Sequence, residues 1–101
     1  MKTKKVFTLI LILLFICNSF AINLRGQVRG YNVYNGFFPY VSAQVNLYIG
    51  RNPIISYTDN YGMYYFYNIP PGRYTIQIGN YRFLYDVIGN TAWQDIPVVT
   101  F

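Results

Sequence analysis

The sequence predicts an all-β fold, a seven-stranded antiparallel β-sandwich. Apolar and polar residues alternate over short segments after residue 21, as in half-buried strands. Turn signals rich in Gly, Pro and Asn separate these segments at roughly eight to twelve residues. No window after residue 21 has the length and periodicity of a helix. Short strands at this spacing are typical of a sandwich.

The amino-terminal segment has the pattern of a secretory signal peptide. Three lysines in the first five residues precede the almost unbroken apolar run Val6–Cys17. Ser19 and Ala21 place small residues at the positions that signal peptidase requires. We therefore expect residues 1–21 to be a signal peptide cleaved after Ala21, and residues 22–101 to form one exported domain, in the periplasm or at the cell surface.

Cys17 is the single cysteine of the chain. One interpretation is an apolar filler that leaves with the signal peptide, so that the domain has no disulfide. The other is a lipoprotein acceptor, although the large Ile16 precedes it. We expect contact with a membrane only if Cys17 is lipidated.

The first predicted strand is Leu24–Tyr31, with Val28 facing inward and Arg25, Gln27 and Arg29 facing outward. The phase of the last strand is ambiguous, because either Ile96 and Val98 or Val99 and Phe101 could face the core. The other predicted strands are Val41–Ile49, Ile54–Thr58, Met63–Asn68, Arg73–Ile78, Tyr81–Val87 and Ile96–Phe101.

Residues 32–40 are predicted to be a loop with an unusual content of rings. Tyr34, Phe37 and Phe38 lie around the turn signal Asn35-Gly36. Two interpretations remain open. The rings tuck under the edge of the sandwich, or they form an exposed contact surface.

Two turns frame the strand Met63–Asn68. The Asp59 carboxylate can accept hydrogen bonds from nearby backbone N–H groups, and Gly62 can adopt the positive φ that ends such a turn. In the second turn Pro71 fixes φ and Gly72 supplies a positive φ.

This stretch resembles a known family. Thr58-Asp59-x-x-Gly62, followed by Tyr64-x-Phe66-x-Asn68-Ile69-Pro70-Pro71-Gly72, is similar to the carboxypeptidase regulatory-like domain, which is grouped with transthyretin-like (prealbumin) and collagen-adhesin-B-like sandwiches. The resemblance implies a transthyretin-like fold in which Tyr64 and Phe66 point inward. It implies no particular activity, because this fold carries many roles.

The composition of residues 22–101 includes few side chains of the types that carry out catalysis. Residues 22–101 contain no His, Cys, Lys or Glu, which excludes Ser-His-Asp and Cys-His arrangements and zinc sites of His and Cys. Asp59, Asp86 and Asp95 are the only carboxylates, and nothing in their spacing pairs them. Five scattered arginines form no nucleic-acid patch. We expect no enzyme activity, no cofactor, no metal and no nucleic-acid partner.

The surface is what remains for function. Tyr48, Met63, Tyr65 and Tyr67 would form an aromatic patch if they share an outward sheet face. Such rings can anchor a protein interface, stack on sugars, or simply pair across strands. We expect a structural or protein-interaction module of the bacterial cell envelope. The alternative is a small carbohydrate-binding module, which the kinship of this fold with starch-binding-like sandwiches also favours.

Overall fold

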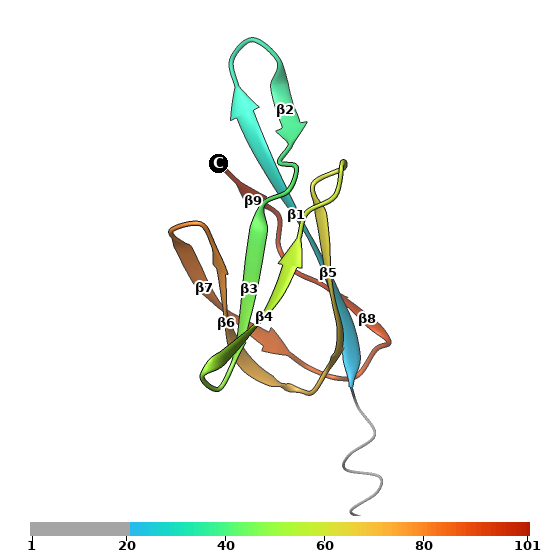
Figure 1. The fold of residues 1–101 in the computed structure, drawn as a ribbon. Helices are drawn as coiled ribbons and strands as arrows, with labels where there is room; N and C mark the ends of the chain where they lie inside the picture. The colour runs from blue at the N-terminus through green and yellow to red at the C-terminus, as the bar shows by residue number, and fades with distance from the viewer. Residues whose placement is uncertain (1–20) are drawn as a thin grey trace, which may run out of the picture.

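A computed structural model describes residues 21–101, which form a β-sandwich of two sheets (Figure 1). The predicted signal peptide and Cys17 lie outside the described residues. Nine strands are present in the described part, two more than the sequence predicts. No helix among residues 21–101 has the length and apolar character needed to cross a membrane.

The first sheet is built around β1 (Ile22–Asn32), a long strand that pairs on both sides. On one side it pairs antiparallel with β5 (Met63–Ile69) and then with β2 (Gly36–Pro39). On the other side it pairs with β8 (Trp93–Asp95) and β9 (Val99–Thr100). These last two pairings are parallel, so the expected purely antiparallel sandwich is wrong at its carboxyl end.

The second sheet is antiparallel, in the order β4-β3-β6-β7. Its strands are β3 (Gln44–Ile49), β4 (Asn52–Tyr57), β6 (Gly72–Ile78) and β7 (Tyr81–Val87). In this sheet β6 and β7 follow the predicted segments closely, β4 begins two residues before its predicted segment, and β3 begins after Ser42. The φ of Ser42 is 59°, a left-handed conformation that interrupts an extended strand.

The core between the sheets is mostly aliphatic. Tyr64 and Phe66 are the two aromatic residues buried in it, which confirms the predicted inward face of β5. Most of the other rings lie at the surface, although Tyr74, Phe83 and Tyr85 pack against the core from its edge. The buried hydrophobic residues are Ile22, Leu24, Val28, Val45, Leu47, Tyr64, Phe66, Ile69, Ile76, Ile78, Val87 and Ile96.

Rings cover two inward-facing glycines of β1. Gly26 is paired with Tyr64 and Gly30 with Phe38. A Cβ at Gly26 would lie within 2.7 Å of three atoms of the Tyr64 side chain. The two glycines therefore make room for rings that lie against the backbone of the central strand.

The turn before β5 has the predicted geometry. Asp59 Oδ1 accepts hydrogen bonds from the backbone N–H groups of Tyr61 (2.9 Å) and Met63 (3.0 Å), and Gly62 has a φ of 75°. Gly72 also has a positive φ, 158°, close to the extended range, and it begins β6 after Pro71. Asp59, Gly62, Pro71 and Gly72 thus have structural positions.

Residues 32–40 form a hairpin rather than a loop. Tyr31 pairs with Phe37 and Gly30 with Phe38, so β1 and β2 extend as a two-stranded ribbon that projects from the body (Figure 1). The predicted last strand, Ile96–Phe101, is also different, because it is interrupted around Pro97 and only Val99–Thr100 forms a strand, β9, whereas β8 lies before the predicted segment. Ile96 and Val99 both face the core as a result, and Val98 is exposed.

Candidate functional site

Three aromatic side chains meet on the outer face of the first sheet. We call Tyr65, Tyr67 and Trp93 the aromatic cluster. The rings of Tyr65 and Tyr67 are stacked, with centroids 6.4 Å apart and an interplanar angle of 18°. Trp93 meets both rings edge-on, at 6.3 Å and 6.0 Å. Tyr67 is 60% exposed and Trp93 40%, so the cluster is open to solvent.

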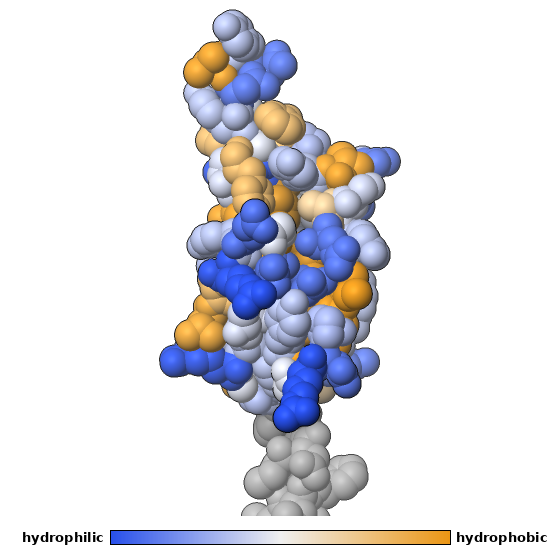
Figure 2. Space-filling view, turned by 60° about the vertical axis from the view of Figure 1, so that its left-hand side comes forward, coloured by the Kyte–Doolittle hydropathy of each residue, from blue (hydrophilic) through white to orange (hydrophobic). Residues whose placement is uncertain are grey.

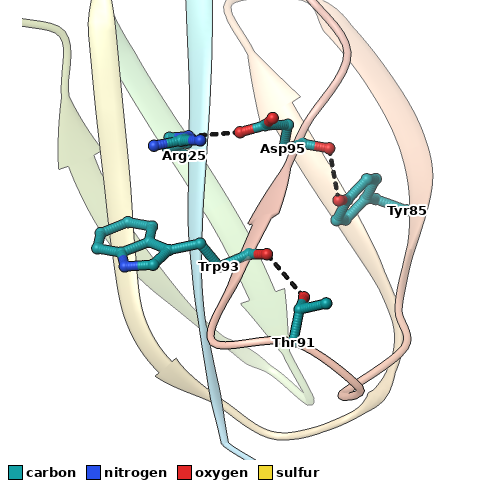
Figure 3. A network of polar contacts seen from close by, with 5 residues as sticks. All are labelled: Arg25, Tyr85, Thr91, Trp93 and Asp95. Atoms are coloured by element: carbon teal, nitrogen blue, oxygen red, sulfur yellow. Dashed lines mark hydrogen bonds and ion pairs between the residues drawn. The ribbon is translucent and has the colours of Figure 1, made fainter.

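Strand alternation places these rings together. On β5, Tyr64 and Phe66 point into the core, so Tyr65 and Tyr67 must point outward. Trp93 belongs to β8, which lies on the other side of β1 from β5. Its indole reaches across β1 toward β5 (Figure 3). The cluster therefore spans three strands that are far apart in the sequence.

An exposed ion pair lies beside the cluster. Arg25 is paired with Tyr65 on one side and with Asp95 on the other, so the three residues form one row across the sheet. Arg25 Nε donates a hydrogen bond to Asp95 Oδ1, and this bond raises the pKa of Arg25. The guanidinium carbon lies 5.7 Å from the centre of the Trp93 ring, within reach of a cation–π contact.

Hydrogen bonds to the backbone hold β8 in position (Figure 3). The Thr91 hydroxyl donates to the Trp93 carbonyl (2.7 Å) and the Tyr85 hydroxyl donates to the Asp95 carbonyl (2.8 Å). Partial burial raises the pKa of Tyr85, so this hydroxyl keeps its proton. The cluster and the ion pair are thus presented by fixed strands.

The predicted patch residues divide between the two sheets. Met63 lies on the same outward face of β5 as Tyr65 and Tyr67, as expected. Tyr48 lies on β3 of the second sheet, where its hydroxyl donates to Gln77 Oε1 (3.0 Å). The expectation that Tyr48 shares their face is wrong, because β3 and β5 belong to different sheets.

Sequence reasoning missed Trp93, which it left in a loop. A usable signal was present in the alternation of Trp93 and Asp95 with Gln94 and Ile96. The segment is only three residues long as a strand, too short for alternation to stand out. Its position next to β1 depends on a parallel pairing, which a scheme of antiparallel hairpins does not include.

The projecting hairpin carries a second group of rings. Tyr34 is 92% exposed and Phe37 58%, so these two rings do not tuck under the edge of the sandwich, and their role as a contact surface stays a prediction. Phe37 and Phe38 are neighbours in β2 and point to opposite faces of the ribbon. Phe38 covers Gly30, whereas Phe37 contacts Tyr31 and lies 3.9 Å from the Arg29 guanidinium carbon. The rings predicted to form one binding site in a loop therefore lie on two different surfaces of the hairpin.

Hydrophobic and hydrophilic residues are interspersed on the face shown in Figure 2, and the projecting hairpin also carries hydrophobic surface. Residues 21–101 contain no group of three or more His, Cys, Asp or Glu side chains that could hold a metal ion. The chemistry available at the aromatic cluster is ring stacking, together with hydrogen bonding by the Arg25–Asp95 pair.

No protein-family model matches this chain, and no characterised protein matches its sequence. Several solved structures are similar to it. A DUF3823 family protein from Bacteroides ovatus has a TM-score of 0.51 and 23% identity over 76% of this chain. BcpA, the major pilin subunit of Bacillus cereus, has a TM-score of 0.56 and 12% identity over 79%. A candidate carbohydrate-binding protein from Pseudomonas aeruginosa has a TM-score of 0.55 and 12% identity over 80%.

The match covers different shares of these proteins. It spans 43% of the DUF3823 protein and 29% of the pilin, but 88% of the Pseudomonas aeruginosa protein. At these identities the similarity shows the β-sandwich fold. The resemblance to the carboxypeptidase regulatory-like family stays a prediction.

Proposed function

We propose that this protein is an exported, non-enzymatic β-sandwich module that binds another protein at the bacterial cell envelope through the aromatic cluster. The observation that carries the proposal is the outward cluster of Tyr65, Tyr67 and Trp93, which are held on two strands, β5 and β8, on either side of β1. Trp and Tyr are enriched among the residues that carry most of the binding energy near the centres of protein interfaces. The signal-peptide pattern supports export, and a pilin subunit among the similar structures is compatible with a role at the envelope.

A pull-down tests this proposal. The exported protein is immobilised and incubated with envelope extract, and retained proteins are identified by mass spectrometry. We expect the variant Tyr67→Ala/Trp93→Ala to lose a partner that the wild type retains. Tyr61→Ala is the matched control, because Tyr61 is 77% exposed and belongs to no ring pair among residues 21–101. Identical retention by the double variant and the wild type would contradict the proposal.

A second candidate function is binding of a glycan. The observation that favours it is the Arg25–Asp95 pair beside the cluster, because sugars need polar groups to orient them as well as rings to stack on. The similar Pseudomonas aeruginosa protein adds support. A glycan array separates the two candidates. A signal that is lost in Trp93→Ala and in Asp95→Asn supports glycan binding. The absence of a signal on every glycan rules out this candidate function.

A further inference from the structure

The two sheets leave an open side between β7 and β9. A hollow of about 330 Å³ lies there, lined by Tyr81 at the start of β7 and by residues 98–101. β7 pairs with β6 on one edge, and β9 pairs with β1 on one edge. The other edges of β7 and β9 border the hollow. We call this space the β7–β9 gap.

At the carboxyl end of β7, the side chain of Gln94 already makes hydrogen bonds to the free edge of the strand. Gln94 Nε2 donates to the carbonyl of Asp86 (2.7 Å), and Gln94 Oε1 accepts from the N–H of Ile88 (3.1 Å). The amide of Gln94 thus makes the donor and acceptor contacts that a peptide group of an added strand would make. The Tyr85 hydroxyl, bound to the Asp95 carbonyl, closes the same region.

Toward the start of β7, the outward backbone groups have no hydrogen-bond partner among residues 21–101. Because the Asp86 carbonyl points away from β6, the alternation of an antiparallel ladder points the N–H and C=O groups of Leu84 and Arg82 the same way. On the opposite side, the N–H and C=O groups of Phe101 bond to β1, so those of Thr100 point away from β1. Backbone donors and acceptors therefore face the gap from both sides.

The rim of the gap is basic. Arg82 lies on β7, and Arg29 lies next to β9, where its Nε donates to Thr100 Oγ1 (3.0 Å). The ion pairs of residues 21–101 are Arg25–Asp95 and Arg73–Asp86, so they leave Arg29 and Arg82 without a carboxylate. The third aspartate, Asp59, accepts from the backbone of its own turn. An occupant of the gap would find two arginines without a carboxylate partner, of which Arg29 already contacts Thr100 and the ring of Phe37.

We propose that the β7–β9 gap binds an extended acidic peptide strand, which pairs antiparallel with the free half of β7. Exposed strand edges bind peptides through backbone hydrogen bonds, and alternate side chains supply specificity. Acidic residues at alternate positions would face outward toward Arg82 and Arg29, and the residues between them would fill the hollow against Tyr81 and Phe101. This site lies apart from the aromatic cluster, so it stands or fails independently of the proposed function.

The probe is a fluorescein-labelled hexapeptide, Thr-Glu-Val-Glu-Val-Thr, and the control peptide has lysine in place of each glutamate. Fluorescence anisotropy with the exported protein measures binding. We expect saturable binding of the acidic peptide and at least roughly tenfold weaker binding of the basic one. Binding should slow hydrogen exchange at the amides of Arg82, Leu84 and Thr100.

Two pairs of variants locate the site. Leu84→Pro removes the outward N–H without removing a bond to β6, whereas Leu84→Ala keeps that N–H and removes only an exposed side chain. We expect the proline variant to lose roughly tenfold in affinity and the alanine variant to bind normally. Arg82→Glu should also bind at least roughly fivefold more weakly, and Arg51→Glu, in the turn between β3 and β4, should bind normally. Folding of each variant is checked by circular dichroism.

Several outcomes would overturn this proposal. One is no saturable binding up to about 1 mM peptide. Another is binding that Arg82→Glu and Leu84→Pro leave unchanged. A third is self-association through β7, seen as a dimer in sedimentation that the peptide does not dissociate. Trp93→Ala should bind the peptide like the wild type, so a loss in that variant would also contradict the assignment to β7.

Discussion

Substituting alanine for Gly26 tests the packing of the central strand directly. The new Cβ would lie within 2.7 Å of three atoms of Tyr64, where carbon atoms normally approach to about 3.5–4.0 Å. Tyr64 is fully buried and meets Phe66 edge-on at 5.9 Å, so its ring has little room to move. Gly26 does not have a positive φ, so the backbone tolerates alanine and only the clash is tested.

Two limits bound the size of the effect. If the core adjusts around the extra methyl group, overpacking costs about 1–3 kcal/mol. If the ring is expelled, roughly 150–250 Å² of buried surface is lost at about 25 cal/mol per Å², or about 4–6 kcal/mol. Alanine also reduces the conformational entropy of the unfolded chain, which offsets the loss of stability by only about 0.4–1 kcal/mol. We therefore expect Gly26→Ala to lower the free energy of unfolding by about 2–4 kcal/mol.

Urea denaturation followed by circular dichroism measures this loss, and Gly30→Ala is the matched control. A Cβ at Gly30 also clashes, within 2.9 Å of three ring atoms, but the ring belongs to Phe38. Phe38 is 39% exposed on the projecting hairpin and can turn away into solvent. The control should lose less than about 1 kcal/mol. Equal losses at the two glycines, or a loss below about 0.5 kcal/mol at Gly26, would refute the reasoning.

Three further predictions concern polar groups. Thr58→Val should lower the free energy of unfolding by about 1–3 kcal/mol in urea titrations, because the buried hydroxyl bonds to two backbone groups; an unchanged midpoint would contradict this. Within the described part of the chain the buried Tyr64 hydroxyl has no hydrogen-bond partner, and burial raises its pKa. Ionisation then favours the unfolded chain, so the wild type should lose stability above about pH 10 and Tyr64→Phe should lose less of it. The hydrogen bond from Arg73 lowers the pKa of Asp86 in the folded protein. The pair therefore stabilises the fold at pH values above the pKa of Asp in the unfolded chain, about 3.9, and this stabilisation is lost as the pH falls through the lower pKa of the folded state. The difference in urea midpoint between wild type and Asp86→Asn should therefore be present at neutral pH and disappear in acid.

The sequence predicted the parts of the fold that local physics determines. On β5 the resemblance implied that Tyr64 and Phe66 point inward, and alternation then placed Tyr65 and Tyr67 outward. The turn at Asp59 and Gly62 follows from the side chain that accepts backbone N–H groups and from the residue that tolerates positive φ. β7 begins and ends at the predicted residues, Tyr81–Val87. Each of these features depends on residues close together in the chain.

The features that depend on long-range pairing were not predictable in the same way. Trp93 joins the cluster only because β8 runs parallel to β1, about seventy positions earlier in the chain. The assignment of Tyr48 failed for the same reason, since alternation gives the face of a strand but not the sheet to which the strand belongs. The sequence predicts a loop rather than a hairpin for residues 32–40, because β2 has only four residues and includes Pro39.

The location of the rings connects stability and function. An aliphatic core with two buried rings closes the sandwich, so most of the aromatic residues are not needed to fill it. Natural surfaces seldom leave rings grouped and exposed without a contact to make, because such patches promote association. Here Tyr67 and Trp93 are held by neighbouring rings and by the backbone bonds of β8, rather than by burial. A surface that is ordered before binding loses little entropy when a partner arrives, and this is the physical basis for assigning recognition to the outer face of the first sheet.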